Sequence, residues 1–189
     1  MKKVTVLFLI CLASVAGLVS FATAAMMPDY IYLFDKNKPD LTNWRDKFED
    51  NASSNAKIFL EDSPEGKVAV IEGLSDKESF GCVYQDVTVD VDKYPVLEID
   101  VNSTSKMWYI ILVCENLKDK EVDFDNNKFV RLQFDTDRAG KRTYNLKTLT
   151  GLTGEQTFRL KVGIATGDVY IPAVGIKMVF RSLKLVGTK

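Results

Sequence analysis

Short runs in which apolar and polar residues alternate follow one another along most of the chain. The two clearest runs are residues 86–92 and 96–102, and each places aliphatic side chains on one face of an extended strand and carboxylates or amides on the other. Alternation of this kind predicts antiparallel strands with one face in a core and the other in water. Pro95 cannot donate to a β-ladder, so we expect it at the start of the second strand.

The same pattern predicts further strands at residues 30–34, 56–60, 68–71, 130–134, 158–164 and 175–186. Pro64 and Gly66 lie between the second and third of these runs and predict a hairpin turn. The last run changes its alternation near Ser182, as a β-bulge would. Residues 107–115 are apolar on both faces, which indicates either a central strand covered on both sides or an aromatic contact surface. Residues 144–151 are the one plausible helix, about a single turn long.

The first residues have the three parts of a secretory signal peptide. Two lysines precede an uncharged run from Val4 to Val19, and Ala22-Thr23-Ala24 forms a small-x-small cleavage site. The apolar run is shorter than the ~20 residues that span a bilayer, which favours cleavage over an uncleaved anchor. We therefore predict a signal peptide at residues 1–24 and a single β-sandwich domain at residues 25–189. The protein would be periplasmic or secreted from a bacterial cell, with no membrane span after cleavage.

Composition excludes several classes of chemistry. The chain has no histidine, which rules out Ser-His and Cys-His catalysis and histidine-ligated metal sites. Its formal net charge of −1 gives no electrostatic basis for binding nucleic acid. Cys82 and Cys114 remain after signal cleavage. In an oxidising compartment they are explained equally well by one disulfide and by two buried thiols.

Three stretches of the chain resemble galactose-binding-domain-like β-sandwiches, the jelly rolls that serve as carbohydrate-binding modules. Residues 84–101 (YQDVTVDVDKYPVLEIDV) resemble the strand–D-x-D-K-Y-P–strand block of such domains. Residues 143–165 (TYNLKTLTGLTGEQTFRLKVGIA) resemble a second block, and residues 174–187 (VGIKMVFRSLKLVG) resemble the last strand. The resemblance implies an all-β antiparallel sandwich and a non-catalytic module that holds sugars.

Sugar recognition needs an aromatic face for ring C–H groups and polar groups for hydroxyls. Trp108 and Tyr109 adjoin on one predicted strand, so they must point to opposite faces, and one of them could face a ligand. The polar partners would come from neighbouring strands, namely Arg131, Gln133 and Arg159. Tryptophan in a core and arginines in solvent would explain the same pattern.

Two aromatic residues in predicted loops are further candidates. Trp44 lies in a polar loop, where it either stacks on a ligand or plugs the end of the sandwich. Tyr170 lies in the loop 167–172 between two late strands, at an end of the sandwich where binding loops gather.

A cluster of oxygen-bearing side chains predicts a calcium site or a simple turn. Asp123, Asp125 and Asn127 offer several oxygens close together, although the spacing is not that of an EF-hand. Glu61, Asp62 and Glu65 pose the same choice in the first hairpin. The resemblance adds weight to a structural calcium ion, and no other cofactor is expected.

The resulting hypothesis is a secreted, non-catalytic carbohydrate-binding protein that holds a glycan by aromatic stacking and hydrogen bonds. The alternative is a protein–protein or assembly module of the cell envelope that uses the same sandwich. A jelly-roll glycosidase or lyase comes third. Its two carboxylates would need a sugar-sized gap and one raised pKa, whereas Asp86, Asp90, Glu98 and Asp100 are spaced as charges on the wet faces of strands.

Overall fold

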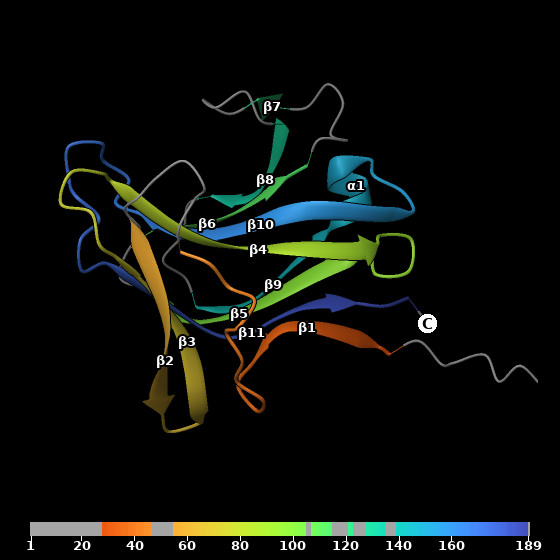
Figure 1. Ribbon diagram of the computed structural model, residues 1–189, viewed down its shortest axis with the longest axis horizontal. Coiled ribbons are helices and arrows are strands. Elements are labelled where there is room, and N and C mark those ends of the chain that lie inside the picture. Colours follow the sequence, from red (N-terminus) through yellow and green to blue (C-terminus); the bar gives the residue numbers. More distant parts are fainter. Residues whose placement is uncertain are drawn as a thin grey trace, which may run out of the picture.

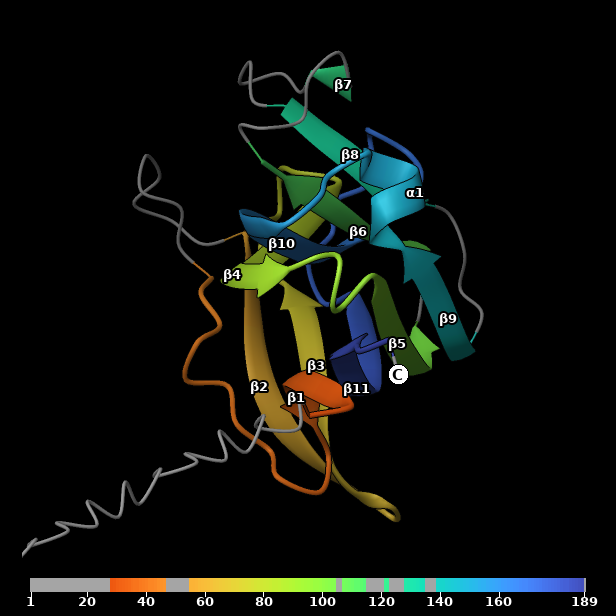
Figure 2. The same cartoon turned by 90° about the vertical axis from the view of Figure 1, so that its right-hand side faces the viewer.

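The protein is a sandwich of two antiparallel β-sheets that pack face to face (Figure 1). The computed structural model describes residues 28–46, 55–104, 107–114, 121–122, 128–134 and 139–188. Figure 2 shows the two layers one above the other, with β4, β6, β8 and β10 in the upper sheet. The all-β antiparallel sandwich predicted from the alternating runs is confirmed.

The larger sheet has six strands. Its order is β2 (Ala56–Ser63), β3 (Gly66–Gly73), β11 (Lys177–Val186), β5 (Val96–Thr104) and β9 (Gly140–Asn145), and β1 (Tyr30–Asp35) also pairs with β11. The smaller sheet has five strands, in the order β4 (Phe80–Asp90), β10 (Glu155–Ala165), β6 (Met107–Val113), β8 (Lys128–Phe134) and β7 (Glu121–Val122).

The two alternating runs that stand out in the sequence belong to different sheets. β4 pairs with β10 in the smaller sheet, and β5 lies between β11 and β9 in the larger one. The aliphatic side chains of both strands are buried, among them Val87 and Val89 on β4 and Leu97 and Ile99 on β5. The chain therefore crosses from one sheet to the other at residues 91–95, and the two apolar faces meet in the core.

The core between the sheets contains a cluster of aromatic side chains. Phe34, Trp44 and Phe180 pack together, with ring centroids 5.3 Å apart for Phe34–Phe180 and 6.2 Å apart for Trp44–Phe180. Trp108 on β6 is fully buried in the same cluster. β6 lies between β10 and β8, which confirms the prediction of a central strand.

The break in alternation near Ser182 is a β-bulge. The register between β11 and β5 shifts between Phe180 and Ser182. Before the bulge Met178 and Phe180 are buried, and after it Leu183 and Leu185 are buried. The extra residue turns two successive side chains, Arg181 and Ser182, toward the same outer pocket of the sheet.

The predicted helical turn is α1 (Leu146–Thr150), at one end of the sandwich. The side chain of Asn145 accepts a hydrogen bond from the Thr148 N–H at 2.9 Å, as an N-cap does. Gly151 ends the helix in the left-handed conformation with φ 71°. The neighbouring strand β9 was not predicted, because its sequence GKRTYN carries few apolar residues.

Cys82 and Cys114 do not form a disulfide in this structure. Both thiols are free and buried. Cys82 lies opposite Gly163 on β10, whereas Cys114 follows Val113, which lies opposite Arg159. Five residues of strand separate the two positions along the sheet, about 17 Å. A disulfide needs Cα atoms within about 7 Å.

Candidate functional site

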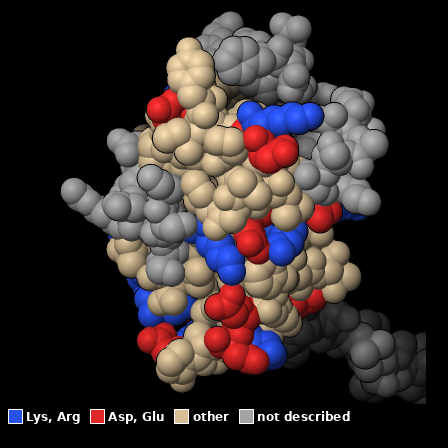
Figure 3. All heavy atoms as spheres, turned by 90° about the vertical axis from the view of Figure 1, so that its left-hand side faces the viewer, with Lys and Arg blue, Asp and Glu red and all other residues tan. Residues whose placement is uncertain are grey.

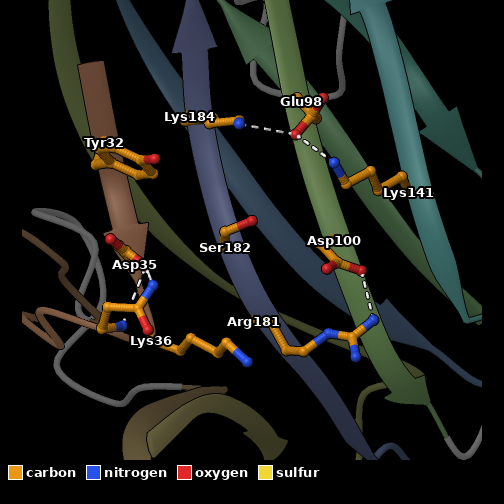
Figure 4. A pocket seen from close by; sticks show the side chains of 10 residues that line it. Tyr32, Asp35, Lys36, Glu98, Asp100, Lys141, Arg181, Ser182 and Lys184 are labelled. Atoms are coloured by element: carbon orange, nitrogen blue, oxygen red, sulfur yellow. Dashed lines mark hydrogen bonds and ion pairs between the residues drawn. The ribbon is translucent and has the colours of Figure 1, made fainter. Parts of the chain in front are cut away.

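The outer face of the six-stranded sheet carries a polar groove with a volume of about 190 Å³ (Figure 4). Three neighbouring strands, β1, β11 and β5, supply most of its walls, and β9 adds one lysine. The lining residues are Tyr32, Asp35, Lys36, Asn37, Glu98, Asp100, Lys141, Arg181, Ser182 and Lys184. We call it the tyrosine groove, because Tyr32 is the aromatic residue in its wall.

Strand register brings these side chains together. Tyr32 lies opposite Lys184, and Lys184 lies opposite Glu98, so three strands contribute one row of side chains. A second row runs through residues 35, 182, 100 and 141 of β1, β11, β5 and β9. Directly opposed residues of antiparallel strands share a face of the sheet. The groove therefore follows from pairings among four strands that are distant in sequence.

Two exposed tyrosines of β1 lie at one side of the groove, where Tyr32 lines the pocket and Tyr30 flanks it. Tyr32 is 50% exposed and Tyr30, two residues earlier on β1, is 43% exposed. Their ring centroids lie 6.0 Å apart at 48°. The Nζ atom of Lys184 lies 4.0 Å from the Tyr30 ring centroid, a cation–π contact that fixes the lysine beside the rings. The groove thus joins apolar ring surface to charged side chains.

The charged side chains of the groove are held in ion pairs. Lys184 Nζ lies 3.1 Å and Lys141 Nζ 3.5 Å from the same Glu98 oxygen, Oε1. Neither approach has the geometry of a hydrogen bond, so Oε1 is ion-paired without accepting one. Lys184 and Glu98 are mostly buried, with side chains 13% and 15% exposed. Burial of this kind makes the pair rigid and costly to separate.

Arg181 joins the floor of the groove to the first hairpin. Its guanidinium donates to Asp100 Oδ1 at 2.9 Å and to Glu65 Oε2 at 3.0 Å, and Lys36 Nζ lies 3.4 Å from the same Glu65 oxygen. The hydrogen bonds from Arg181 and then Lys36 hold the pKa of Glu65 below its ordinary value. The bonds to Asp100 and Glu65 raise the pKa of Arg181. Arg181 Nε is buried without a hydrogen-bond partner.

The groove can accommodate a ligand that carries many hydroxyl groups. Hydroxyls both donate and accept, which suits a site that mixes carboxylate oxygens, amide groups and cationic N–H groups. A ring with an apolar face could lie against Tyr32 at the same time. Exposed aromatic surface beside fixed polar groups is the arrangement that sugar recognition requires.

The residues predicted on strands lie on the other sheet. Tyr109, Arg131 and Arg159 belong to β6, β8 and β10, and the pairings Ile111–Arg131 and Lys161–Ile111 place them on the outer face of the five-stranded sheet. The side chain of Gln133 is outside the described part of the structure. The structure thus brings three of the predicted residues to one face, but the side chains of Tyr109 and Arg159 already contact other residues of the protein there.

Arg159 covers the aromatic ring beneath it. Its guanidinium lies 4.2 Å from the Tyr84 ring centroid and donates to Asp86 at 2.8 and 3.0 Å. These bonds lower the pKa of Asp86. Tyr84 is 1% exposed, and Tyr109 is 6% exposed with its hydroxyl 3.5 Å from the Gly81 carbonyl oxygen. In this structure neither ring offers a free face to a ligand.

Both tryptophans are core residues. Trp108 is fully buried, and Trp44 is 7% exposed with its Nε1–H donating to the Leu33 carbonyl at 3.1 Å. Stacking of a sugar on either side chain would require the sandwich to open. We therefore assign neither tryptophan to ligand binding. Both pack in the core, which is the second of the two explanations that the sequence allowed.

Tyr170 is 90% exposed at the tip of the β10–β11 loop. The loop is fixed from inside: the Thr166 hydroxyl shares its hydrogen between the carbonyl oxygens of Asp168 and Ile171, at 2.6 and 3.0 Å, and the Asp168 carboxylate accepts from the Tyr170 N–H at 2.9 Å. Further large apolar side chains are exposed in the same loop and in residues 74–80, a segment that accepts hydrogen bonds from the Thr166 and Ala173 N–H groups at the carbonyls of Ser79 and Glu78. The exposed members are Leu74, Phe80, Val169, Ile171 and Val174. This end of the sandwich faces the viewer in Figure 3, where tan surface lies among the charged groups.

The predicted calcium ligands Asp123, Asp125 and Asn127 lie outside the described residues, so that site stays a prediction. In the first hairpin, Asp62 pairs with Lys67 at 2.9 Å, and Glu65 pairs with Arg181 and Lys36. Within the described ranges no group of three or more histidine, cysteine, aspartate or glutamate residues could hold a metal ion. In the same ranges no helix has the length and hydrophobicity needed to cross a membrane.

Sequence reasoning missed the tyrosine groove for a physical reason. Alternation identifies Glu98 and Asp100 as wet-face residues, but it does not say which strands lie beside β5. The partners β1 and β11 come from opposite ends of the chain. The useful signal was Tyr30 and Tyr32 at alternate positions of the opening strand, because two aromatics on one strand face are either core or contact surface.

No protein-family model matches the sequence, and no curated protein matches it significantly. Several solved structures share the fold. One is the CBM22-1–GH10 part of endo-1,4-β-D-xylanase 10B from Clostridium thermocellum, complexed with xylohexaose, with 8% identity and a TM-score of 0.51. The match covers 85% of this chain and only 29% of that chain, so the protein spans less than a third of the xylanase structure.

Two carbohydrate-binding modules match over nearly their whole length. The family 30 module of the cellulosomal cellulase Cel9D-Cel44B of C. thermocellum has 9% identity and a TM-score of 0.49, over 85% of this chain and 98% of the module. The xylan-binding CBM22-2 domain of Paenibacillus barcinonensis Xyn10C has 12% identity and a TM-score of 0.47, over 84% and 98%. The likeness to the xylanase structure shows the fold alone, an antiparallel β-sandwich.

Proposed function

We propose that the protein is a secreted, non-catalytic glycan-binding protein and that the tyrosine groove is its binding site. The observation that carries the proposal is the exposed ring of Tyr32 beside a row of fixed polar side chains, Lys184 and Glu98. The fold shared with carbohydrate-binding modules supports it. Secretion follows from the signal peptide predicted at residues 1–24.

The proposed mechanism is recognition by a surface formed in advance. A sugar ring lies with its C–H face on Tyr32 and exchanges hydrogen bonds with the groove floor. The ion pairs of Arg181 and Lys184 hold the polar groups in place before the ligand arrives. Less ordering then accompanies binding, which favours affinity.

The carboxylates of the groove are not arranged like those of a glycoside hydrolase. Glu98 and Asp100 lie two residues apart on one strand, and each holds cations from the neighbouring strands. Glycoside hydrolysis uses two carboxylates on opposite sides of the scissile bond. Glu98 and Asp100 instead share one side of the groove, the floor, and the third lining carboxylate, Asp35 on β1, accepts hydrogen bonds from Asn37.

The test is a glycan array probed with residues 25–189, as wild type and as two tyrosine variants. Tyr32→Ala should lose about tenfold or more in affinity, the loss expected when a stacked ring is removed. Tyr170→Ala is the control, because it removes an exposed tyrosine at the end of the sandwich, outside the groove. If the array is silent, or if binding survives Tyr32→Ala unchanged, this assignment of the groove is wrong.

A second function is favoured by the apolar patch around Tyr170. Six large hydrophobic side chains are exposed in residues 74–80 and 169–174, two segments joined by backbone hydrogen bonds. Exposed apolar clusters mark protein interaction sites. Loss of glycan binding on Tyr170→Ala but not on Tyr32→Ala would move the ligand site to this patch. Silence on the array would favour protein docking there.

A further inference from the structure

The charges of the tyrosine groove indicate which sugars it accepts. The lining residues and Glu65 together supply four cations, Lys36, Lys141, Arg181 and Lys184, and four carboxylates, Asp35, Glu65, Glu98 and Asp100. Each of the four cations already holds a carboxylate of this set. With Glu65 counted, the charges around the groove therefore balance, although the groove is built from charged side chains.

Glu98 occupies the central position in this arrangement. A single oxygen, Oε1, faces both Lys184 and Lys141 at 3.1 and 3.5 Å, and Figure 4 shows the two lysines converging on it from opposite sides. A ligand carboxylate that approached either lysine would meet the negative charge of Glu98 and would compete with it for the two cations. The Lys184–Glu98 pair is mostly buried and held against the Tyr30 ring, which makes displacement of Glu98 costly.

We propose that Glu98 makes the groove selective for neutral over acidic sugars by occupying the lysines that a uronate would bind. This inference rests on the proposed glycan-binding function. The ion pairs of Glu98 and Asp100 use Oε1 and Oδ1. Their second oxygens can accept hydrogen bonds from the hydroxyls of a neutral sugar, whereas they repel a carboxylate of like charge.

The inference predicts a gain of binding on a single substitution. Glu98→Gln removes one negative charge, keeps the side-chain shape and releases two cations into the groove. The variant should bind hexagalacturonate at least about tenfold more tightly than wild type at low ionic strength, and salt should screen the gain. Affinity for the fully methyl-esterified hexasaccharide, which has the same backbone without the charge, should not rise.

The experiment combines the array, with neutral and acidic glycans, and calorimetric titration with the two hexasaccharides. The control is Asp62→Asn, which makes the same change of net charge in an exposed hairpin pair with Lys67, 88% exposed at the aspartate. If Glu98→Gln does not fold because Lys184 is left unpaired, Glu98→Gln/Lys184→Met removes both members of the buried pair. Lys141 is then the free cation, and a smaller gain should remain.

The outcomes separate this inference from the proposed function. Wild-type protein that binds no glycan of either class overturns the function. Wild-type protein that binds acidic glycans as tightly as neutral ones overturns the selectivity and leaves glycan binding in place. A Glu98→Gln variant that gains nothing for hexagalacturonate, or gains equally for the methyl ester, shows that Glu98 does not set the selectivity.

Discussion

The outer faces of the two sheets use tyrosine and charged residues in opposite ways. On the six-stranded sheet Tyr30 and Tyr32 are about half exposed, and the nearby cations pair with carboxylates of the sheet. On the five-stranded sheet Tyr84 and Tyr109 are almost fully buried, and the Arg159 guanidinium lies directly over the Tyr84 ring. Similar residue types thus make an accessible groove on one face and a closed surface on the other.

The difference shows that strand pairing, more than composition, decides whether a sheet face can bind. In the groove, side chains of β1, β11 and β5 meet at a bulge that turns Arg181 and Ser182 the same way. On the five-stranded sheet, Gly163 lies opposite Tyr109 and leaves room for its ring to fold down onto the sheet. A glycine thereby closes that face.

The largest effect is expected from filling the space at Gly163. A Cβ atom there would lie 2.3 Å from Tyr109 Cζ and 2.6 Å from the Gly81 carbonyl oxygen. The ring could move but the Gly81 backbone could not, so Gly163→Ala should lower the free energy of unfolding by about 3 kcal/mol. Urea denaturation of the purified protein measures the change.

Gly187→Ala is the matched control for this prediction. Gly187 follows β11, and a Cβ atom there would approach nothing nearer than 3.2 Å, at the edge of the Tyr94 ring. Its cost should stay below about 1 kcal/mol. A Gly163→Ala variant as stable as Gly187→Ala would mean that Tyr109 does not close the face by lying over the glycine.

Much of the fold was predictable, because period-2 alternation is a local signal. The two runs around Pro95, the first hairpin, the bulge near Ser182 and the turn of helix before Gly151 all appear where the pattern placed them. Each of these depends on side chains within a few residues of one another. β9 was missed because it lies at the edge of its sheet, where its residues are mostly exposed.

The candidate site was not predictable in the same way. Strand-face reasoning required Trp108 and Tyr109 to point to opposite faces, and in the structure Trp108 is in the core while Tyr109 shares the outer face with Arg131 and Arg159. It could not show that the Arg159 guanidinium lies over the ring of Tyr84, on a strand far away in the sequence. The groove needs β1 beside β11, a pairing between the two ends of the domain. Such long-range pairings leave no trace in local alternation.

A smaller effect should follow from uncovering the Tyr84 ring. Arg159→Met removes the cation–π contact and both hydrogen bonds to Asp86 while keeping an unbranched apolar side chain. The pair is partly exposed, so we expect a loss of only about 1 kcal/mol in unfolding free energy. Glycan affinity should not change, since the groove is on the opposite sheet. A large loss of affinity would place the ligand on the five-stranded sheet.

A graded effect is expected at Tyr30, which flanks the groove without lining its pocket. Its ring holds Lys184 through the contact at 4.0 Å. Tyr30→Ala should weaken glycan binding about threefold, in line with an exposed cation–π interaction of ~0.6 kcal/mol. The loss on Tyr32→Ala should be larger in the same titration. If the two losses are equal, the ligand contacts both rings and the site extends along β1.

The smallest effect should be the loss of stability as the pH is lowered. It can be compared for one carboxylate on each face. Arg181 lowers the pKa of Glu65 beside the groove, and Arg159 lowers the pKa of Asp86 on the five-stranded sheet. A carboxylate with a lowered pKa in the folded state contributes stability above its unfolded pKa and loses it as pH falls through the folded value. Both contributions should therefore be complete near neutral pH and should be lost progressively as the pH falls below about 4.

Thermal unfolding of Glu65→Gln and Asp86→Asn between neutral and acidic pH measures these contributions separately. Each variant should melt below wild type at neutral pH, and the three curves should converge at acidic pH, where the wild-type carboxylates are protonated as well. Glu65 bonds two cations that approach from different parts of the chain, whereas Asp86 bonds one arginine across a strand pair. Because removing Glu65 leaves Arg181 with Asp100 but Lys36 with no carboxylate in that cluster, glycan affinity should respond to Glu65→Gln and not to Asp86→Asn. A variant that melts below wild type by the same margin at every pH would show that its defect lies in packing, and the ion pair would then play no part in distinguishing the two faces.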